Sequence, residues 1–191
     1  MTRQLAVEYN SYLWFLLGVV WIVSAFFTRR TARRESALNR AIHLLTVAVP
    51  LMMLFTPMAD VPFVGEDLLG ESPVREIAGI ALNALGLAFA IWARYHLGKN
   101  WSGTVTVKEG HELIRTGPYS IVRNPIYTGL ILAYFGSALS QGRLGAVIGL
   151  VILTMAFIRK SRLEEKMMLS HFGSRFTEYQ KAAKLIIPGI Y

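Results

Sequence analysis

The strongest constraint on the fold is a set of long segments with almost no Asp, Glu, Lys or Arg. Tyr9–Phe27 and Ala41–Ala59 are uncharged throughout, and Ile77–Leu97 is apolar apart from Asn83, Arg94 and His96. Arg94 and His96 lie near the end of that segment, where we expect them to snorkel to the interface. About 20 apolar residues in a helix span the roughly 30 Å hydrocarbon core of a bilayer. These segments therefore predict transmembrane helices. The alternative, a soluble helical bundle, would need several helices of a length that rarely lacks charge in soluble proteins.

Two shorter apolar runs, Ile126–Leu139 and Leu144–Ile158, are separated by Ser140-Gln141-Gly142-Arg143. This pattern predicts a tight hairpin of two short, tilted helices. With 53% hydrophobic and 17% charged residues, the chain is expected to be an all-α integral membrane protein with five transmembrane helices. Tyr9–Phe27 lacks a preceding basic region and a cleavage site, so we interpret it as a permanent span rather than a signal peptide.

The basic residues predict the orientation. All but three of the 20 Lys and Arg residues lie between spans one and two, between spans three and four, or in the C-terminal tail, when Arg94 at the end of span three is included. By the positive-inside rule, the N-terminus is outside and the C-terminus inside, as expected for the inner membrane of a prokaryote. We interpret the basic run at 29–34 as a stop signal that touches lipid phosphates. A nucleic-acid or phosphoinositide site is the alternative.

The sequence divides into three parts. Residues 1–60 form an N-terminal transmembrane hairpin, residues 61–76 an acidic external loop, and residues 77–191 the region with unusual chemistry, including a cytosolic loop at 98–125. The absence of cysteine excludes disulfides and thiolate catalysis. The four histidines are dispersed, without HExxH spacing, so no metal site is expected. Neither a P-loop nor a GxGxxG fingerprint occurs.

The loop GHELIRTGPYSIVRNPIYTG, from Gly110 to Gly129, holds a dense set of polar residues. Its prolines prevent one continuous helix, so backbone groups at the membrane edge need partners. A ligand with an adenine edge and a zwitterionic amino-acid end is one solution. The candidate contacts are His111, Tyr119, Arg123 and Asn124, with Trp101 as a further aromatic face. Each of these residues also has a separate structural explanation: a helix cap for His111, a topogenic residue for Arg123, an interfacial aromatic belt for Tyr119 and a turn for Asn124.

A second candidate group follows span five. Glu164 and Glu165 come after Arg159, Lys160 and Arg162 on a helix that is predicted to continue out of the membrane. They form either a surface charge network or a cavity wall in which a carboxylate binds a cationic amine or positions a nucleophile. Gly173 is a plausible helix end. A further helix is predicted over Ser174–Leu185, with Ser174 as its N-cap.

Taken together, the two motifs resemble those of the isoprenylcysteine carboxyl methyltransferases and the related phospholipid methyltransferases, and suggest a prokaryotic member. The resemblance covers roughly Tyr95–Tyr191. Matching positions in the loop are Gly110, His111, Leu113, Ile114, Gly117, Tyr119, Arg123, Pro125, Tyr127 and Gly129, and in the tail Glu164, Glu165, Phe172, Gly173, Phe176, Tyr179 and Pro188. Two departures stand out, Asn124 in place of the usual His and Lys160 in place of an expected Arg.

The resemblance implies an integral membrane enzyme that uses S-adenosylmethionine in a cytosolic pocket and takes a lipid or prenylated acceptor from the bilayer. The cofactor-binding residues that it implies are His111, Glu112, Leu113, Ile114, Tyr119, Arg123, Asn124, Pro125, Ile126 and Glu164. The catalytic residues that it implies, near the reacting groups, are Glu164, Glu165, Lys160 and Arg162. A prenylcysteine carboxylate is the acceptor of the most similar family. Lysine lacks the bidentate fork of arginine, which weakens the case for a carboxylate.

Three other functions compete with this reading. A phospholipid N-methyltransferase would have the same cofactor and would use Glu164 or Glu165 to accept a proton or to steady a cation. Membrane sterol reductases share a similar R-x-P-x-Y element and bind NADPH, but usually have more spans. A non-enzymatic membrane organiser would use the loop only as a scaffold. The sequence does not define the acceptor.

Overall fold

Seven α-helices make up most of the computed structural model, which describes residues 2–28, 31–34, 36–55, 61–101, 106–108 and 112–190. The helices are α1 (Arg3–Ala25), α2 (Ala37–Phe55), α3 (Pro73–Leu97), α4 (Pro118–Ile121), α5 (Pro125–Gln141), α6 (Leu144–Phe172) and α7 (Ser174–Ala182), with a 3-10 turn η2 at Gly98–Asn100. The expected all-α architecture is confirmed, with one addition. A short antiparallel ribbon pairs β1 (Thr31–Arg34) with β2 (Thr106–Lys108).

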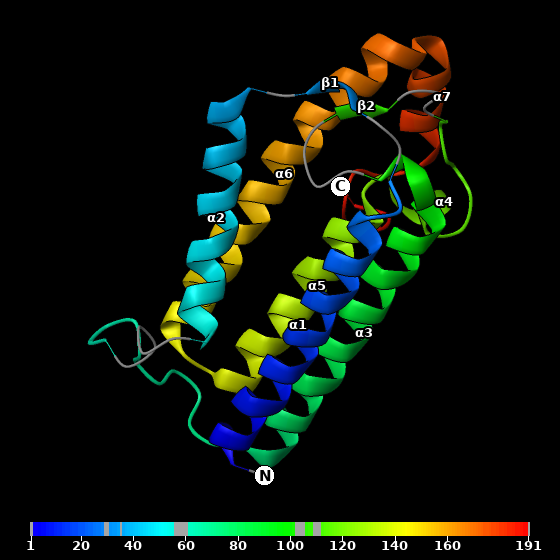
Figure 1. Cartoon of the computed structure of the whole chain (residues 1–191). Coiled ribbons are helices and arrows are strands. Elements are labelled where there is room, and N and C mark those ends of the chain that lie inside the picture. The colour runs from blue at the N-terminus through cyan, green and yellow to red at the C-terminus, as the bar shows by residue number, and fades with distance from the viewer. Residues whose placement is uncertain are drawn as a thin grey trace.

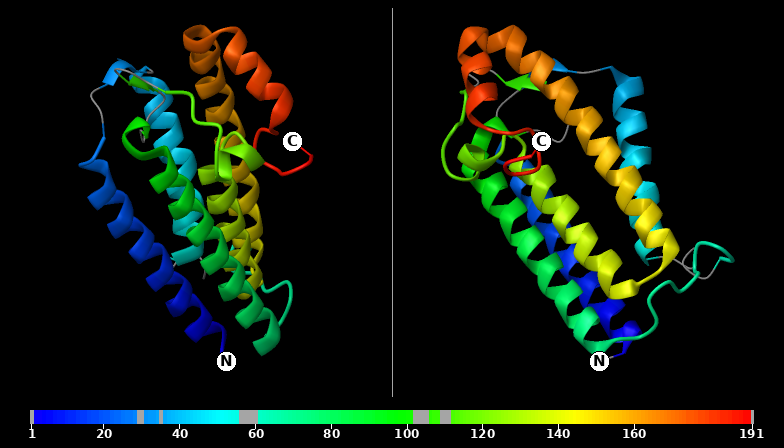
Figure 2. Two further views of the ribbon diagram at one scale, coloured as in Figure 1. Left: turned by 90° about the vertical axis from the view of Figure 1, so that its right-hand side faces the viewer. Right: turned by 180° about the vertical axis from the view of Figure 1, so that it is seen from behind.

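Four of the described helices, α1, α2, α3 and α6, are long and apolar enough to cross a membrane, α3 being counted together with η2. The chain is therefore an integral membrane protein. Helix α5 has 17 residues and runs beside α3, while α2 lies against α6 on the other side of the molecule (Figures 1 and 2). The N-terminus lies at one end of the bundle, and α7, the ribbon and the C-terminus gather at the opposite end (Figure 1).

Helices α3 and α5 pack along a seam of glycines. Gly86 of α3 faces Gly129 of α5, and a Cβ added to either would collide with the backbone of the other helix. Gly79 and Gly136 make the same close approach one heptad away. Small residues let helix backbones approach in a membrane, where the hydrophobic effect does not drive association. The motif residue Gly129 is thus explained by helix packing and not by a turn.

Buried polar side chains join α1 to this pair. The Asn10 side-chain amide donates to the Ser140 hydroxyl at 2.8 Å, and the Asn83 amide donates to Asn10 Oδ1 at 2.6 Å. The Ser137 hydroxyl accepts from Trp14 Nε1 at 3.0 Å. The hydrocarbon core offers no water as an alternative hydrogen-bonding partner, so these bonds fix the relative rotation of the three helices.

The cavity end of the bundle differs from expectation in two places. We expected Arg94 to snorkel to the interface, but it is 3% exposed and donates to the Ser24 carbonyl at 2.6 Å. Its guanidinium also lies 4.3 Å from the Trp101 ring centroid, so aromatic and carbonyl partners hold it inside. Ser174 does not cap α7. Gly173 occupies that position with φ 56°, and it also ends α6 as expected.

Candidate functional site

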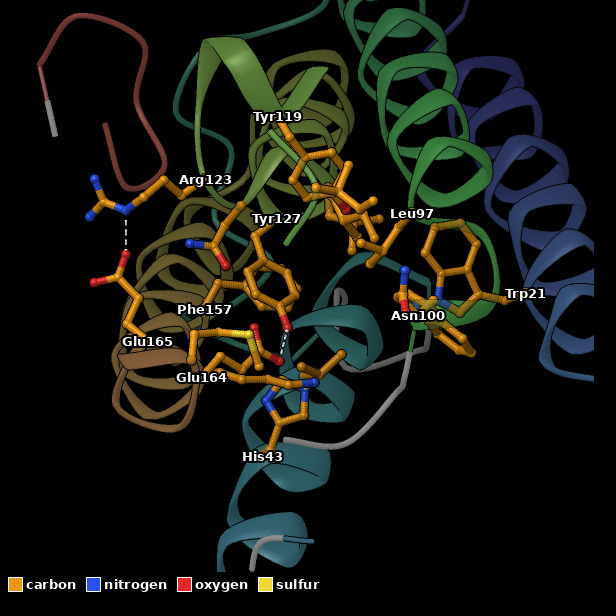
Figure 3. A pocket seen from close by; sticks show the side chains of 18 of the residues that line it. Trp21, His43, Leu97, Asn100, Tyr119, Arg123, Tyr127, Phe157, Glu164 and Glu165 are labelled. Carbon is orange, nitrogen blue, oxygen red and sulfur yellow. Dashed lines mark hydrogen bonds and ion pairs between the residues drawn. The ribbon is translucent and has the colours of Figure 1, made fainter. Parts of the chain in front are cut away.

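One cavity of about 510 Å³ lies where the C-terminal motifs meet the ends of α1, α2 and α3. Its polar wall includes Asn100, Glu112, Arg123, Asn124, Lys160, Glu164 and Glu165, and its apolar wall includes Leu44, Val47, Ala48, Leu51, Leu130 and Phe157. Figure 3 shows the labelled side chains around this space. The site therefore places a charged end next to an apolar face that continues along α2.

The Arg123-Asn124-Pro125 motif holds the segment after α7, residues 183–186. Backbone N–H groups of Arg123 and Asn124 donate to the carbonyls of Lys184 at 2.8 Å and Leu185 at 3.1 Å. The Asn124 side chain donates to the Leu185 carbonyl at 3.2 Å. Asparagine at this position thus supplies an amide N–H that satisfies a buried carbonyl, and it lines the cavity at the same time.

The Arg123 guanidinium connects three elements. It forms an ion pair with Glu165 of α6, and it donates to the carbonyl of Gln180 in α7 at 3.1 Å and to that of Ala183 just after it. The two side chains of the ion pair are 11% and 17% exposed. Charge-assisted bonds of this kind are stronger than neutral ones, so Arg123 fixes the tail against the cavity wall.

Glu164 points to the other side of α6. Its Oε1 accepts a hydrogen bond of 2.8 Å from the Tyr127 hydroxyl. The Tyr127 ring stacks on Phe157 with centroids 4.7 Å apart and an angle of 12° between planes, and Lys160 Nζ lies 5.6 Å from its centroid. Figure 3 shows Glu164 and Tyr127 in the middle of the cavity, between Arg123 and His43. This arrangement brings a carboxylate, an ammonium and two aromatic faces together.

Two tyrosines close the cavity on the side of the loop. The Tyr179 hydroxyl donates to the Tyr119 carbonyl at 2.6 Å and so ties α7 to α4. Burial raises the pKa of both Tyr119 and Tyr179 well above the usual range. Both therefore stay neutral at physiological pH and act as hydrogen-bonding and packing groups.

The structure brings most of the residues named from the sequence to this cavity. The lining includes Glu112, Leu113, Ile114, Tyr119, Arg123, Asn124, Ile126, Lys160, Glu164 and Glu165, and Trp101 as well. Pro125 is buried at the start of α5 without lining the cavity, and Arg162 is exposed on α6. His111 lies outside the described residues. The roles that the family resemblance gives these residues are taken up below as proposals.

The sequence reading missed the walls that the first two helices supply. We interpreted residues 1–60 as an anchoring hairpin, but Trp21 of α1 and His43 of α2 line the cavity, together with the apolar face of α2. Trp21 packs edge-on against Trp101, with ring centroids 6.2 Å apart. One signal was available. A histidine within an otherwise uncharged span is a functional candidate, because ionisable groups are costly in a membrane.

The fold and the site define the class of protein: a helical integral membrane protein with a polar cavity at one end of its bundle. A family model described as phospholipid methyltransferase matches residues 74–175, and the chain belongs to this family. The match covers α3 to the start of α7, which includes the glycine seam and the two glutamates of α6.

Several known proteins are similar to this chain. Over 117 residues it is 31% identical to protein-S-isoprenylcysteine O-methyltransferase of Saccharomyces cerevisiae, covering 60% of this chain and 49% of that protein. Over 72 residues it is 29% identical to methanethiol S-methyltransferase of Pseudomonas deceptionensis, covering 38% and 27%. The chain thus spans about half of the yeast relative, and less of the bacterial one.

A solved structure shares the fold. The eukaryotic intramembrane Ras methyltransferase ICMT (isoprenylcysteine carboxyl methyltransferase) superposes with a TM-score of 0.58 at 22% identity, covering 82% of this chain and 54% of that one. The similarity extends over more of the chain than the sequence relationship does, so it includes parts that come before α3.

Proposed function

We propose that this protein is an S-adenosylmethionine-dependent membrane methyltransferase that acts on a lipid-like acceptor, and that it is most like the isoprenylcysteine carboxyl O-methyltransferases. One observation carries the proposal. A single cavity joins the motif residues of the loop and of α6 to an apolar face on α2. A polar methyl donor would lie at the charged end of this cavity. An acceptor with an apolar chain would place that chain along α2 and its reacting group next to the donor.

The lining suits the proposed cofactor. A sulfonium and an α-ammonium group are cationic. The cavity is lined by the carboxylates of Glu112 and Glu164 and by the rings of Tyr127 and Phe157, and Glu164 contacts Tyr127. Aromatic faces and carboxylates both attract cations. S-adenosylmethionine supplies an activated methyl group, whose bond to sulfur breaks with the electron pair staying on sulfur as a bond to the acceptor forms.

The protein's own contribution would be orientation and exclusion of water. We propose that Glu112, Leu113, Ile114 and Ile126 border the adenosyl part, while Tyr119 closes the cavity above it. Arg123, Asn124 and Pro125 shape this wall through the tail that they hold, and His111 belongs to the same loop. Correct placement of two reactants can lower a barrier by about 7–11 kcal/mol. A carboxylate acceptor then needs no general base.

We propose that the acceptor group sits near Lys160, Glu164 and Glu165, with Arg162 contributing charge at the surface of α6. Helix α5 would be the fifth span, tilted beside α3, with the N-terminus outside and the C-terminus inside a prokaryotic inner membrane. Residues 77–191 would hold most of the catalytic machinery, and the hairpin at 1–60 would complete the cavity. The external segment at 61–76 would include the first turn of α3, which begins at Pro73.

The test is direct. Purified protein is titrated with S-adenosylhomocysteine by calorimetry, with NADPH as the competing cofactor. It is then incubated with S-adenosylmethionine labelled in the methyl group, together with N-acetyl-S-farnesylcysteine or membrane lipids. Binding of the homocysteine product and label in an organic-soluble product are expected. Saturable binding of NADPH alone, with no label in any lipid, would refute the proposal.

The family description favours a second candidate, a phospholipid N-methyltransferase. The same labelling experiment separates the two. Label that is released as methanol by mild base lies in an ester and identifies a carboxylate acceptor. Label that is retained in a phospholipid headgroup identifies an amine.

A further inference from the structure

We infer that His43 of α2 is a positioning residue for the acceptor: it fixes the Lys160 ammonium at the cavity wall, where the pair receives the anionic head of an amphiphilic acceptor. The inference rests on the proposed function and deepens it. It assigns a specific role to a helix that precedes the residues matched by the family model.

The geometry of the pair defines its hydrogen bond. His43 Nε2 lies 3.3 Å from Lys160 Nζ, and Lys160 is 4% exposed. A lysine ammonium has only donors, so the imidazole nitrogen accepts and His43 carries its own proton on Nδ1. The bond holds a long, flexible side chain in one place, and the ammonium remains at a cavity that both residues line.

The other nitrogen of His43 is also informative. Nδ1 is buried and has no hydrogen-bonding partner among the described residues. Buried donors are rarely left unsatisfied in native proteins. This donor has no described partner that would explain the histidine, so the Nε2 contact with Lys160 is the side-chain hydrogen bond that the structure gives for His43.

The surroundings of the pair favour an anion. Tyr127 and Phe157 pack against Lys160 and His43, with the His43 and Phe157 ring centroids 6.1 Å apart. The charged neighbours on α6 are Arg159, whose guanidinium donates to Asn39, and Glu164, which the Tyr127 hydroxyl engages. Low surrounding polarity strengthens the attraction between a buried ammonium and an anionic group.

The apolar face of α2 next to His43 indicates the chemistry of the acceptor beyond its anionic head. Val47 and Leu51 follow His43 at intervals of four residues and line the same cavity, with Leu44 and Ala48 beside them. Residues four apart share a helix face. An acceptor whose anionic head meets Lys160 would therefore lay an apolar chain along this face of α2. Figure 3 shows His43 on α2, below Glu164 and Tyr127.

A purely structural role is the competing explanation, and the chain offers a matched control. One turn before His43, Asn39 accepts a hydrogen bond of 2.6 Å from Arg159. This bond also joins α2 to α6, but Asn39 does not line the cavity. Asn39→Ala therefore loosens the same helix pair without touching the proposed acceptor site.

The experiment measures the affinities of N-acetyl-S-farnesylcysteine and of its neutral carboxamide for the protein saturated with S-adenosylhomocysteine, by tryptophan fluorescence. Wild type and Asn39→Ala are expected to prefer the carboxylate at least tenfold. His43→Leu should lose most of this preference, whereas His43→Gln should recover it, because the amide oxygen can accept from Lys160. The affinity for S-adenosylhomocysteine should change less than twofold in every variant.

Two results would overturn the inference. One is a wild type that binds the acid and the amide equally, and the other is an equal change in His43→Leu and Asn39→Ala. Neither affects the proposed function, because methyl transfer to a thiol or an amine would remain. If S-adenosylhomocysteine does not bind at all, the proposed function fails, and the preference measured without it still decides the role of His43.

Discussion

The ion pair between Arg123 and Glu165 leads to a quantitative prediction about the tail. Both side chains are largely buried, and the guanidinium also donates to two carbonyls in and after α7. Removing one member of a buried pair costs about 3–5 kcal/mol, because the other charge is left without its partner. We expect Arg123→Ala to destabilise the protein by this amount.

Glu165→Ala should cost less, about 1.5–3 kcal/mol, the range for bonds to charged groups, because Arg123 keeps its carbonyl partners. The double variant should be less destabilised than the sum of the two, with a coupling energy of about 1–3 kcal/mol. Unfolding by dodecyl sulfate in mixed micelles, followed by the fluorescence of the 4 tryptophans, provides the free energies.

The pair between Arg3 and Asp67 is the control for this cycle. It lies at the other end of the bundle, its oxygen and nitrogen are 2.6 Å apart, and Asp67 is 40% exposed. Exposed pairs contribute about 0.2–1 kcal/mol, so its coupling energy should be smaller. The reasoning is refuted if Arg123 and Glu165 couple no more strongly than Arg3 and Asp67.

Three further results are expected. Gly86→Leu should cost about 1–3 kcal/mol by forcing apart two touching backbones, whereas Gly18→Leu, with open space around it, should be neutral in the same titration. Glu164→Gln should weaken binding of S-adenosylhomocysteine at least tenfold in calorimetry, and Glu178→Gln on the exposed face of α7 should not. Burial raises the pKa of Tyr179, so its contribution to stability is full below pH of about 10 and declines above it. Tyr179→Phe should lose about 1 kcal/mol at neutral pH and show a smaller decline above pH 10 in unfolding titrations.

Much of the architecture could be predicted from uncharged runs, because the cost of burying charge in hydrocarbon leaves a clear pattern in sequence. The break at Gly142 and the end of α6 at Gly173 were predictable from single glycines, and both have positive φ. The start of α3 was placed too late, at Ile77. The helix begins at Pro73, where Ser72 accepts from the Arg75 N–H as an N-cap, a signal that hydropathy does not register.

The site was predictable only in part. The loop and α6 are dense in polar residues, so their convergence could be expected from composition. The contribution of α1 and α2 could not, because Trp21 and the face of α2 look like ordinary lipid-facing residues until the helices are placed. The position of Arg94 was predicted wrongly for a similar reason. The sequence does not show that the Ser24 carbonyl and the Trp101 ring lie inside the bundle, where they bind its guanidinium.

The tail that pairs with the Arg123-Asn124 backbone has a consequence for biogenesis. Translation proceeds from the N-terminus, so residues 183–186 leave the ribosome only after helices α1 to α7. Until then the wall formed by Phe176 and Tyr179 is missing, and the nascent chain has a half-built pocket. Ligand binding should therefore begin only after this segment has docked, and it would report that residues 183–186 are in place.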